Sequence, residues 1–183
     1  MNEQLEILCD VAARLASAGI DYMVTGSIAS AVYAVPRMTR DIDIVIHIAP
    51  AEGEKLIAAF KDDYYLDDET LLQAVRHQGM FNVIDQRTII KIDFIIRKDD
   101  EYRRVEFDRR RQVAINGYRV WMVAPEDLIL SKLLWGGKSE SELQFRDVKQ
   151  LLSVVKKMDT AYLRDWAARL GVADLLEKAM PHE

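Results

Sequence analysis

A run of alternating residues from position 41 to position 48 constrains the fold of this chain more than any other feature. Isoleucines stand at every second position of this run, at Ile42, Ile44, Ile46 and Ile48. Successive side chains of a β-strand point to opposite faces, so the isoleucines share one face and Asp41 and Asp43 share the other. The run therefore predicts a strand with one buried face and with two carboxylates on its polar face.

In the segment before this strand, the spacing of the apolar residues changes from helical to β and back to helical. Apolar residues recur at helical spacing over residues 3–18, which predicts an amphipathic helix. Residues 22–25 form a short β-type run that ends at Gly26 and Ser27, and small apolar residues over 28–34 predict a second helix. The expected order is helix, strand, glycine turn, helix and then the alternating strand.

The remainder of the chain predicts two β-hairpins and several helices. One hairpin joins residues 81–85 to 88–97, and the other joins 112–115 to 118–123 through the turn Asn116-Gly117. Further helices are expected over 50–61, 68–77, 125–135, 139–157, 159–170 and 172–180, with breaks at Gly136-Gly137 and at Gly171. This order predicts a mixed α/β (α+β) fold with a core over residues 1–123 and a C-terminal helical region over 124–183 packed on it.

Composition and charge exclude several classes of protein. The chain has 183 residues, of which 50% are hydrophobic and 30% charged, so it can build a core and is not disordered. Its net charge of −5 argues against nucleic-acid binding through bulk positive charge. The single Cys9 excludes an intrachain disulfide, no signal-like segment opens the chain, and no apolar run approaches the ~20 residues of a membrane span. We therefore expect a cytoplasmic protein with no membrane partner.

Three polar features follow one another along the predicted core: Gly26-Ser27, the pair Asp41 and Asp43, and Asp93 in a later strand. A Gly-Ser turn at a helix N-terminus offers N–H groups, a hydroxyl and the positive end of the helix dipole to a phosphate. Carboxylates at positions i and i+2 lie about 7 Å apart on one strand face and can share Mg²⁺ ions with a third acid. Two such ions stabilise both the attacking and the leaving oxygen. The constellation predicts nucleotidyl or phosphoryl transfer.

Each feature also has a structural interpretation. A Gly-Ser pair at a strand end is often only a turn, and an Asp-x-Asp pair is often a solvated strand face. The like charges of Asp41 and Asp43 repel unless a positive charge lies between them. A metal ion would supply that charge, and Arg37, Arg40 or Lys91 would be the structural alternative.

The order of these motifs resembles the DNA polymerase beta-like nucleotidyltransferase superfamily. It consists of Val24-Thr25-Gly26-Ser27, thirteen residues, Asp41-Ile42-Asp43-Ile44, and a later strand with Asp93. The segment Arg37-Met38-Thr39-Arg40 before the acid pair looks like the form found in minimal bacterial members. Residues 123–133 and 145–148 are similar to the C-terminal region of AbiEii-type nucleotidyltransferase toxins. The resemblance covers residues 20–155.

The resemblance implies a mixed-sheet polymerase-beta-like core and transfer of a nucleoside monophosphate from a nucleoside triphosphate to a hydroxyl. Gly26 and Ser27 would bind the triphosphate, Asp41 and Asp43 would bind Mg²⁺ or Mn²⁺, and Asp93 would be the third acid and a general base. The acceptor would be an RNA such as tRNA, a protein or a small molecule. If the chain is the toxin of a toxin–antitoxin pair, an antitoxin protein would be a further partner.

Lys132 and Asp147 complete the set of candidate nucleotide-binding residues. The resemblance implies that Lys132 reaches the phosphates and that Asp147 supports it. Both residues also fall within apolar helical stripes, where a charge needs a partner. A buried structural ion pair between the two is therefore an equally good interpretation, and both can hold together.

Two other functions compete with the transferase. Lys149 stands where relatives often carry a second acid, which keeps open a non-catalytic nucleotide-binding module of the same fold. An antibiotic-modifying nucleotidyltransferase would differ only in its acceptor.

The local basic run from Arg103 to Arg111 could steer a polyanion, although a solvated element is the favoured interpretation. Trp121, Trp135 and Trp166 are expected in the core.

Overall fold

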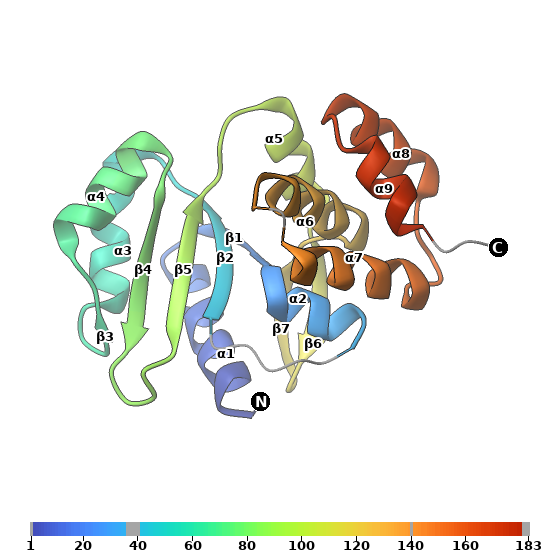
Figure 1. Cartoon of the computed structure of the whole chain (residues 1–183). Coiled ribbons are helices and arrows are strands. Elements are labelled where there is room, and N and C mark those ends of the chain that lie inside the picture. The colour runs from blue at the N-terminus through green and yellow to red at the C-terminus, as the bar shows by residue number, and fades with distance from the viewer. Residues whose placement is uncertain (1, 36–40, 140, 181–183) are drawn as a thin grey trace. The chain divides into compact units, whose positions relative to one another are not determined.

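The computed structural model describes residues 2–35, 41–139 and 141–180, which form two compact units (Figure 1). The first unit comprises Met1–Ile28 and Met38–Val123, and the second comprises Ala29–Arg37 and Ala124–Glu183. Among the described helices, none is long and apolar enough to cross a membrane.

A mixed β-sheet organises the first unit. Within the described residues its strands are β1 (Asp21–Thr25), β2 (Asp41–His47), β3 (Tyr64–Tyr65), β4 (Met80–Asp85), β5 (Lys91–Ile96), β6 (Arg111–Ile115) and β7 (Tyr118–Met122). Their order across the sheet is β3-β4-β5-β2-β1-β7-β6. The pairs β2–β5 and β1–β7 are parallel, and the remaining neighbours are antiparallel. The expectation of a mixed α/β fold is confirmed.

The first unit also contains helices, and aromatic contacts show which face of the sheet one of them covers. The first unit contains α1 (Asn2–Ser17), the start of α2 (Gly26–Tyr33), the short helix η1 (Pro50–Glu52), α3 (Gly53–Phe60), α4 (Asp68–His77) and α5 (Glu101–Asp108). The ring of Phe60 on α3 lies 5.5 Å from that of Phe94 on β5, and Phe94 stacks on Phe81 of β4 at 5.1 Å. The paired strand β2 buries Ile42 and Ile44 on this same face. Asp41, Asp43 and Asp93 alternate with these residues and therefore lie on the other face.

The second unit is helical. Besides the later part of α2, it contains α6 (Pro125–Ser139), α7 (Glu142–Val154), α8 (Thr160–Arg169) and α9 (Ala173–Ala179). Helices α8 and α9 lie side by side (Figure 1). The buried carboxylates of Glu126 and Asp127 occupy the first turn of α6, where the helix dipole favours negative charge. Glu126 accepts a hydrogen bond from the Asp159 N–H at 2.9 Å, and Asp127 accepts one from the Tyr162 hydroxyl at 2.6 Å. These bonds join the starts of α6 and α8.

Several local expectations were wrong. The sequence did not predict β3 or α5, because two residues are too few to show a period and α5 is rich in arginine and acids. Helix α6 continues through Gly136 to Ser139 instead of breaking at the glycine pair. A Cβ at Gly136 would lie only 3.2 Å from the Cβ of Gln144, so this glycine permits a close approach of α7.

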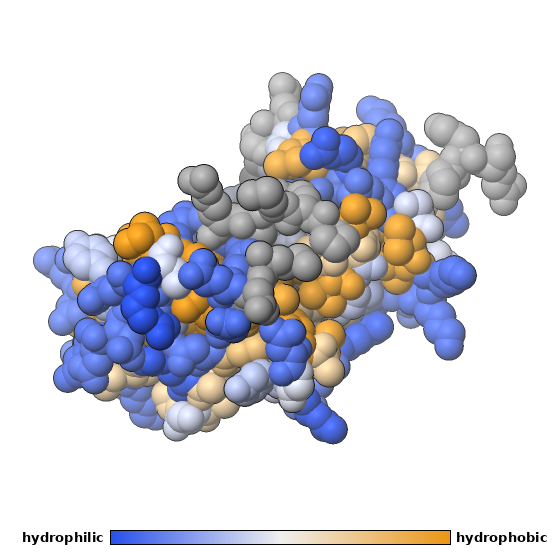
Figure 2. All heavy atoms as spheres, turned by 90° about the horizontal axis from the view of Figure 1, so that it is seen from below, coloured by the Kyte–Doolittle hydropathy of each residue, from blue (hydrophilic) through white to orange (hydrophobic). Residues whose placement is uncertain are grey.

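Large apolar side chains reach the surface in separate patches among hydrophilic ones (Figure 2). Trp135 is 53% exposed, which contradicts its expected place in the core, whereas Trp166 is buried as expected. Trp135 lies near the end of α6, where the apolar run of that helix gives way to glycine.

A strained isoleucine stands in the loop between β4 and β5. The buried carboxylate of Asp85 accepts hydrogen bonds from the N–H groups of Arg87 (3.0 Å) and Thr88 (2.9 Å), which tightens the loop. Ile89 then takes a φ of +59° with its side chain 73% exposed. This backbone region is unfavourable for a β-branched residue, and the exposed side chain gains little burial in return.

We expect Ile89→Gly to raise the free energy of unfolding by about 0.5–1 kcal/mol, because glycine adopts positive φ without steric cost. Urea denaturation followed by circular dichroism measures the change. Ile89→Ala is the matched control, since it removes the side chain but keeps the unfavourable φ, and it should change stability by less than about 0.5 kcal/mol. A loss of stability in the glycine variant would show that the Ile89 side chain stabilises the loop.

Candidate active site

The pairing of β2 with β5 brings three carboxylates to one sheet face. In this parallel register Asp43 lies directly beside Asp93, and Asp41 lies beside Lys91. On its other side Asp93 is paired with Asn82 of β4. The acid pair and the later acid, which are separated by about fifty residues in the sequence, therefore stand on adjacent strands at the same end of the sheet.

Gly26 lies directly against the carboxylate of Asp43. Strand β1 ends at Thr25, which pairs with Asp43, and the next residue begins α2 with a φ of +65°. A Cβ on Gly26 would stand 2.9 Å from the Cβ and 2.6 Å from the Cγ of Asp43, and closer still to a carboxylate oxygen. Glycine is thus required here both by the backbone conformation and by the neighbouring acid. Ser27 follows in the first turn of α2.

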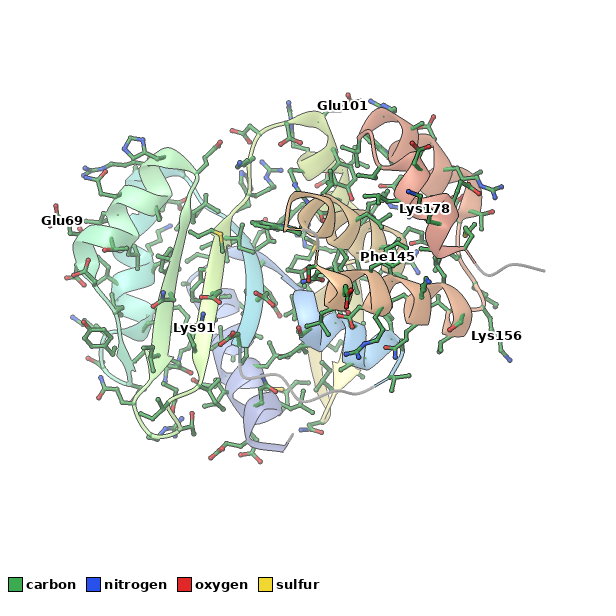
Figure 3. The ribbon with its side chains drawn as sticks, in the orientation of Figure 1. Glu69, Lys91, Glu101, Phe145, Lys156 and Lys178 are labelled. Carbon is green, nitrogen blue, oxygen red and sulfur yellow. The ribbon has the colours of Figure 1, made fainter. Side chains whose placement is uncertain are left out.

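Lys91 adds a positive charge to this group. Its Nζ lies 2.8 Å from Asp93 Oδ2 and 3.8 Å from Asp41 Oδ1 (Figure 3 labels Lys91 on β5). The hydrogen bond to Asp93 is the main reason why the pKa of Lys91 is raised above its ordinary value, and the charges of Asp93, Asp41 and Asp43 act in the same direction. The sequence had suggested Lys91 only as a structural alternative to a metal ion. The other two candidates for that role, Arg37 and Arg40, lie outside the described residues.

The donor set fits a hard divalent cation in its chemistry. Asp41, Asp43 and Asp93 offer only carboxylate oxygens, which Mg²⁺ prefers, and the missing Cβ of Gly26 gives the Asp43 carboxylate the room that it occupies. As the side chains are placed, no group of three or more His, Cys, Asp or Glu residues in the described part of the chain is arranged to hold a metal ion. The positive charge next to Asp93 is the Lys91 ammonium.

Lys132 and Asp147 form a buried ion pair within the second unit. The Nζ of Lys132 on α6 lies 2.8 Å from Asp147 Oδ2 on α7, and the two side chains are only 4% and 2% exposed. Lys132 also donates a hydrogen bond to Gln144 Oε1 at 2.9 Å. The structural interpretation of this pair is confirmed. Gln144 was missed, although its position three residues before Asp147 on one helix was a usable signal.

His47 and the basic run from Arg103 to Arg111 make contacts outside the carboxylate group. His47 shares the polar face of β2 with Asp43 but stands at the opposite end of the strand, with its ring edge-on to Phe107 at 6.2 Å. Within the arginine run, Arg103 pairs with Glu106 at 2.7 Å and Arg110 pairs with Asp21 at 3.2 Å. Arg103 and Arg110 are only 25% and 15% exposed, so the expected solvated element is not what the structure shows at these two positions.

Gly26→Ala should lower the free energy of unfolding by more than Gly19→Ala does. Both glycines have positive φ, so each alanine costs about 1–2 kcal/mol of backbone strain. A Cβ at Gly19 would meet nothing within 4 Å, whereas at Gly26 it would force Asp43 to move. Paired denaturation curves therefore isolate the contact between Gly26 and Asp43. Equal losses in the two variants would contradict this close packing.

Comparisons with known proteins agree on the fold. No family model matches the chain, and the search of curated proteins finds no match. A nucleotidyltransferase-like antigen from Paracoccidioides brasiliensis is a structural neighbour at 19% identity, with a TM-score of 0.60 and coverage of 98% of this chain and 95% of that one. A putative nucleotidyltransferase from Thermotoga maritima has 15% identity, a TM-score of 0.56 and coverage of 92% and 95%. The enzyme ANT(2″)-Ia, solved with adenylyl-2″-tobramycin, has 12% identity, a TM-score of 0.61 and coverage of 92% and 97%.

These neighbours define the fold as that of nucleotidyltransferase-like proteins, as the resemblance in the sequence predicted. At such low identities the likeness concerns the fold.

Proposed function

We propose that this chain is a metal-dependent nucleotidyltransferase, which moves a nucleoside monophosphate from a nucleoside triphosphate to a hydroxyl and releases pyrophosphate. One observation carries the proposal: Asp43 lies beside Asp93 on the neighbouring strand and directly against Gly26 at the start of α2. A strand end with only a solvated acid would not need a glycine pressed against that acid. Nucleotidyltransferase-like structural neighbours support the same class of reaction.

Each residue of the group has a proposed role. Asp41 and Asp43, with Asp93 as a third ligand, would hold Mg²⁺, or Mn²⁺, which when bound neutralises phosphate charge and stabilises the attacking and leaving oxygens. Gly26 would let a phosphate approach the backbone, and Ser27 would donate hydrogen bonds to its oxygens from the first turn of α2. Asp93 would accept the proton of the acceptor hydroxyl. The acceptor oxygen then bonds to the α-phosphorus, the bond from that phosphorus to the bridging oxygen breaks, and pyrophosphate leaves.

Lys132 and Asp147 have a secondary place in the proposal. The buried pair of Lys132 and Asp147 has no net charge as a unit, so its main contribution is to the packing of α6 against α7. A nucleotide contact by Lys132, supported by Asp147, is proposed from the resemblance alone. Calorimetry of ATP binding to Lys132→Arg tests it, because arginine keeps the charge but changes the donor geometry.

The acceptor is proposed only as a hydroxyl on an RNA such as tRNA, on a protein or on a small molecule. Two structural neighbours are described with antibiotics: ANT(2″)-Ia with adenylyl-2″-tobramycin, and the lincosamide adenylyltransferase LnuA with lincomycin. Likeness to AbiEii-type toxins would instead imply a tRNA acceptor and an antitoxin partner. A toxin role and a cytoplasmic location stay predictions, as does the division into a core over 1–123 and a helical region over 124–183.

Incubation of the purified protein with each α-labelled nucleoside triphosphate, Mg²⁺ and total cell extract tests the proposal. We expect Mg²⁺-dependent label in one fraction of the extract, and that fraction identifies the acceptor as RNA, protein or small molecule. Purified aminoglycosides and lincosamides, tested separately, examine the antibiotic alternative. Nucleotide binding by calorimetry without labelling of any fraction would favour the non-catalytic module.

A further inference from the structure

A single ammonium bridges the carboxylates of two neighbouring strands. Lys91 begins β5 directly beside Asp41 of β2, and it precedes Asp93 by two residues on the same strand face. Its Nζ is within hydrogen-bond distance of Asp93, at 2.8 Å, and lies 3.8 Å from an oxygen of Asp41. The pairing of β2 with β5 therefore places the Lys91 ammonium beside the carboxylates of Asp41 and Asp93.

Of the two acids that contact Lys91, the more buried one has the shorter contact. The Asp93 side chain is 17% exposed, against 50% for Asp41 and 39% for Lys91. A partly buried carboxylate loses hydration and gains most from a charged hydrogen-bond donor. Lys91 therefore offsets part of the repulsion among the three carboxylates.

We infer that Lys91 is a resident counter-ion of Asp93 and Asp41 and competes with a divalent cation for their oxygens. The inference rests on the proposed function, since it assigns those oxygens to the metal site. An ammonium hydrogen-bonded to Asp93 blocks one coordinating oxygen and cancels one of the negative charges that attract a cation. The flexible four-carbon stem of lysine allows Nζ to leave without a change of the backbone.

Removing the charge should therefore tighten metal binding. We expect Lys91→Met to lower the dissociation constant for Mn²⁺ about fivefold, measured by electron paramagnetic resonance without nucleotide. A fivefold change in the dissociation constant is what the loss of one partly exposed ion pair is expected to produce. Lys91→Arg retains a positive charge and should bind Mn²⁺ close to the wild-type value. Lys98→Met removes an exposed lysine beyond the other end of β5 and serves as the matched control.

Thermal melting gives a second readout that is independent of catalysis. In EDTA, Lys91→Met should melt below the wild type because Asp93 then loses its hydrogen-bonded ammonium. On addition of Mg²⁺ the Tm of the variant should rise more than that of the wild type, because the protein that binds the ion more tightly is stabilised more by it. A purely structural lysine would lower Tm under both conditions and would not increase the affinity for Mn²⁺.

The outcomes separate this inference from the proposed function. If the wild type binds Mn²⁺ and Lys91→Met binds it equally or more weakly, the counter-ion role is wrong and the transferase assignment stands. If neither protein binds Mn²⁺, the inference fails together with the proposed metal site. Tighter binding by Lys91→Met alone among the three variants supports the inference.

Discussion

Replacement of Asp43 by asparagine should reduce nucleotidyl transfer at least about 10³-fold, without unfolding the protein. Metal-assisted charge stabilisation contributes several kcal/mol to this type of reaction, and each 1.4 kcal/mol corresponds to a factor of ten. Asparagine keeps the shape of Asp43 against Gly26 and its place beside Asp93, but it removes the charge. The measurement is the initial rate of label transfer from an α-labelled nucleoside triphosphate at saturating Mg²⁺.

Asp62→Asn provides the matched control for this experiment. Asp62 is an exposed acid outside the carboxylate group, and its replacement should leave the rate unchanged. The free energy of unfolding of Asp43→Asn should stay within about 1 kcal/mol of the wild type, because one like charge is removed from a group of three. An Asp43→Asn protein with full transfer activity would show that the acids are only a polar strand face neutralised by Lys91.

Lys132→Met should produce the largest loss of stability, about 3–5 kcal/mol. The substitution leaves the buried carboxylate of Asp147 without its Lys132 partner at 2.8 Å, and an uncompensated buried charge is costly. It also removes the donor to Gln144 that links α6 to α7. Chemical denaturation monitored by circular dichroism measures the loss.

Two further variants show whether the loss comes from the buried charge. Lys132→Met combined with Asp147→Leu removes both charges and should recover much of the stability, because apolar residues of similar size often replace a buried pair at little cost. Arg164→Met breaks an ion pair with Glu177 in which both side chains are more than half exposed, and it should cost less than about 1 kcal/mol. A loss for Lys132→Met no larger than that for Arg164→Met would contradict the buried-pair account.

The core of the fold was predictable because its residues alternate or recur with a clear period. The isoleucines of β2 identified the strand and its buried face, and the turn Asn116-Gly117 marked the hairpin of β6 and β7. The motif order around Gly26 and the three acids indicated a nucleotidyltransferase-like fold, which the structural neighbours support.

Features that depend on strand register or on close packing were not predictable. Periodicity shows which face Lys91 occupies, but only the pairing of β2 with β5 places it beside Asp41. The sequence predicted a break at Gly136, because glycine is read as a helix breaker, whereas the structure uses it to bring α7 close to α6. Trp135 was expected in the core because it falls in an apolar run, and it is exposed.

We propose that the carboxylate group supports transfer of the nucleotide portion of the triphosphate and not of its terminal phosphate. A comparison of α-labelled and γ-labelled nucleoside triphosphate, with Mg²⁺ and the acceptor fraction, tests it most directly. We predict that the α-label enters the acceptor and that the γ-label leaves as pyrophosphate, with both processes absent in EDTA. Label from the γ position in the acceptor, or Mg²⁺-independent incorporation, would contradict the account.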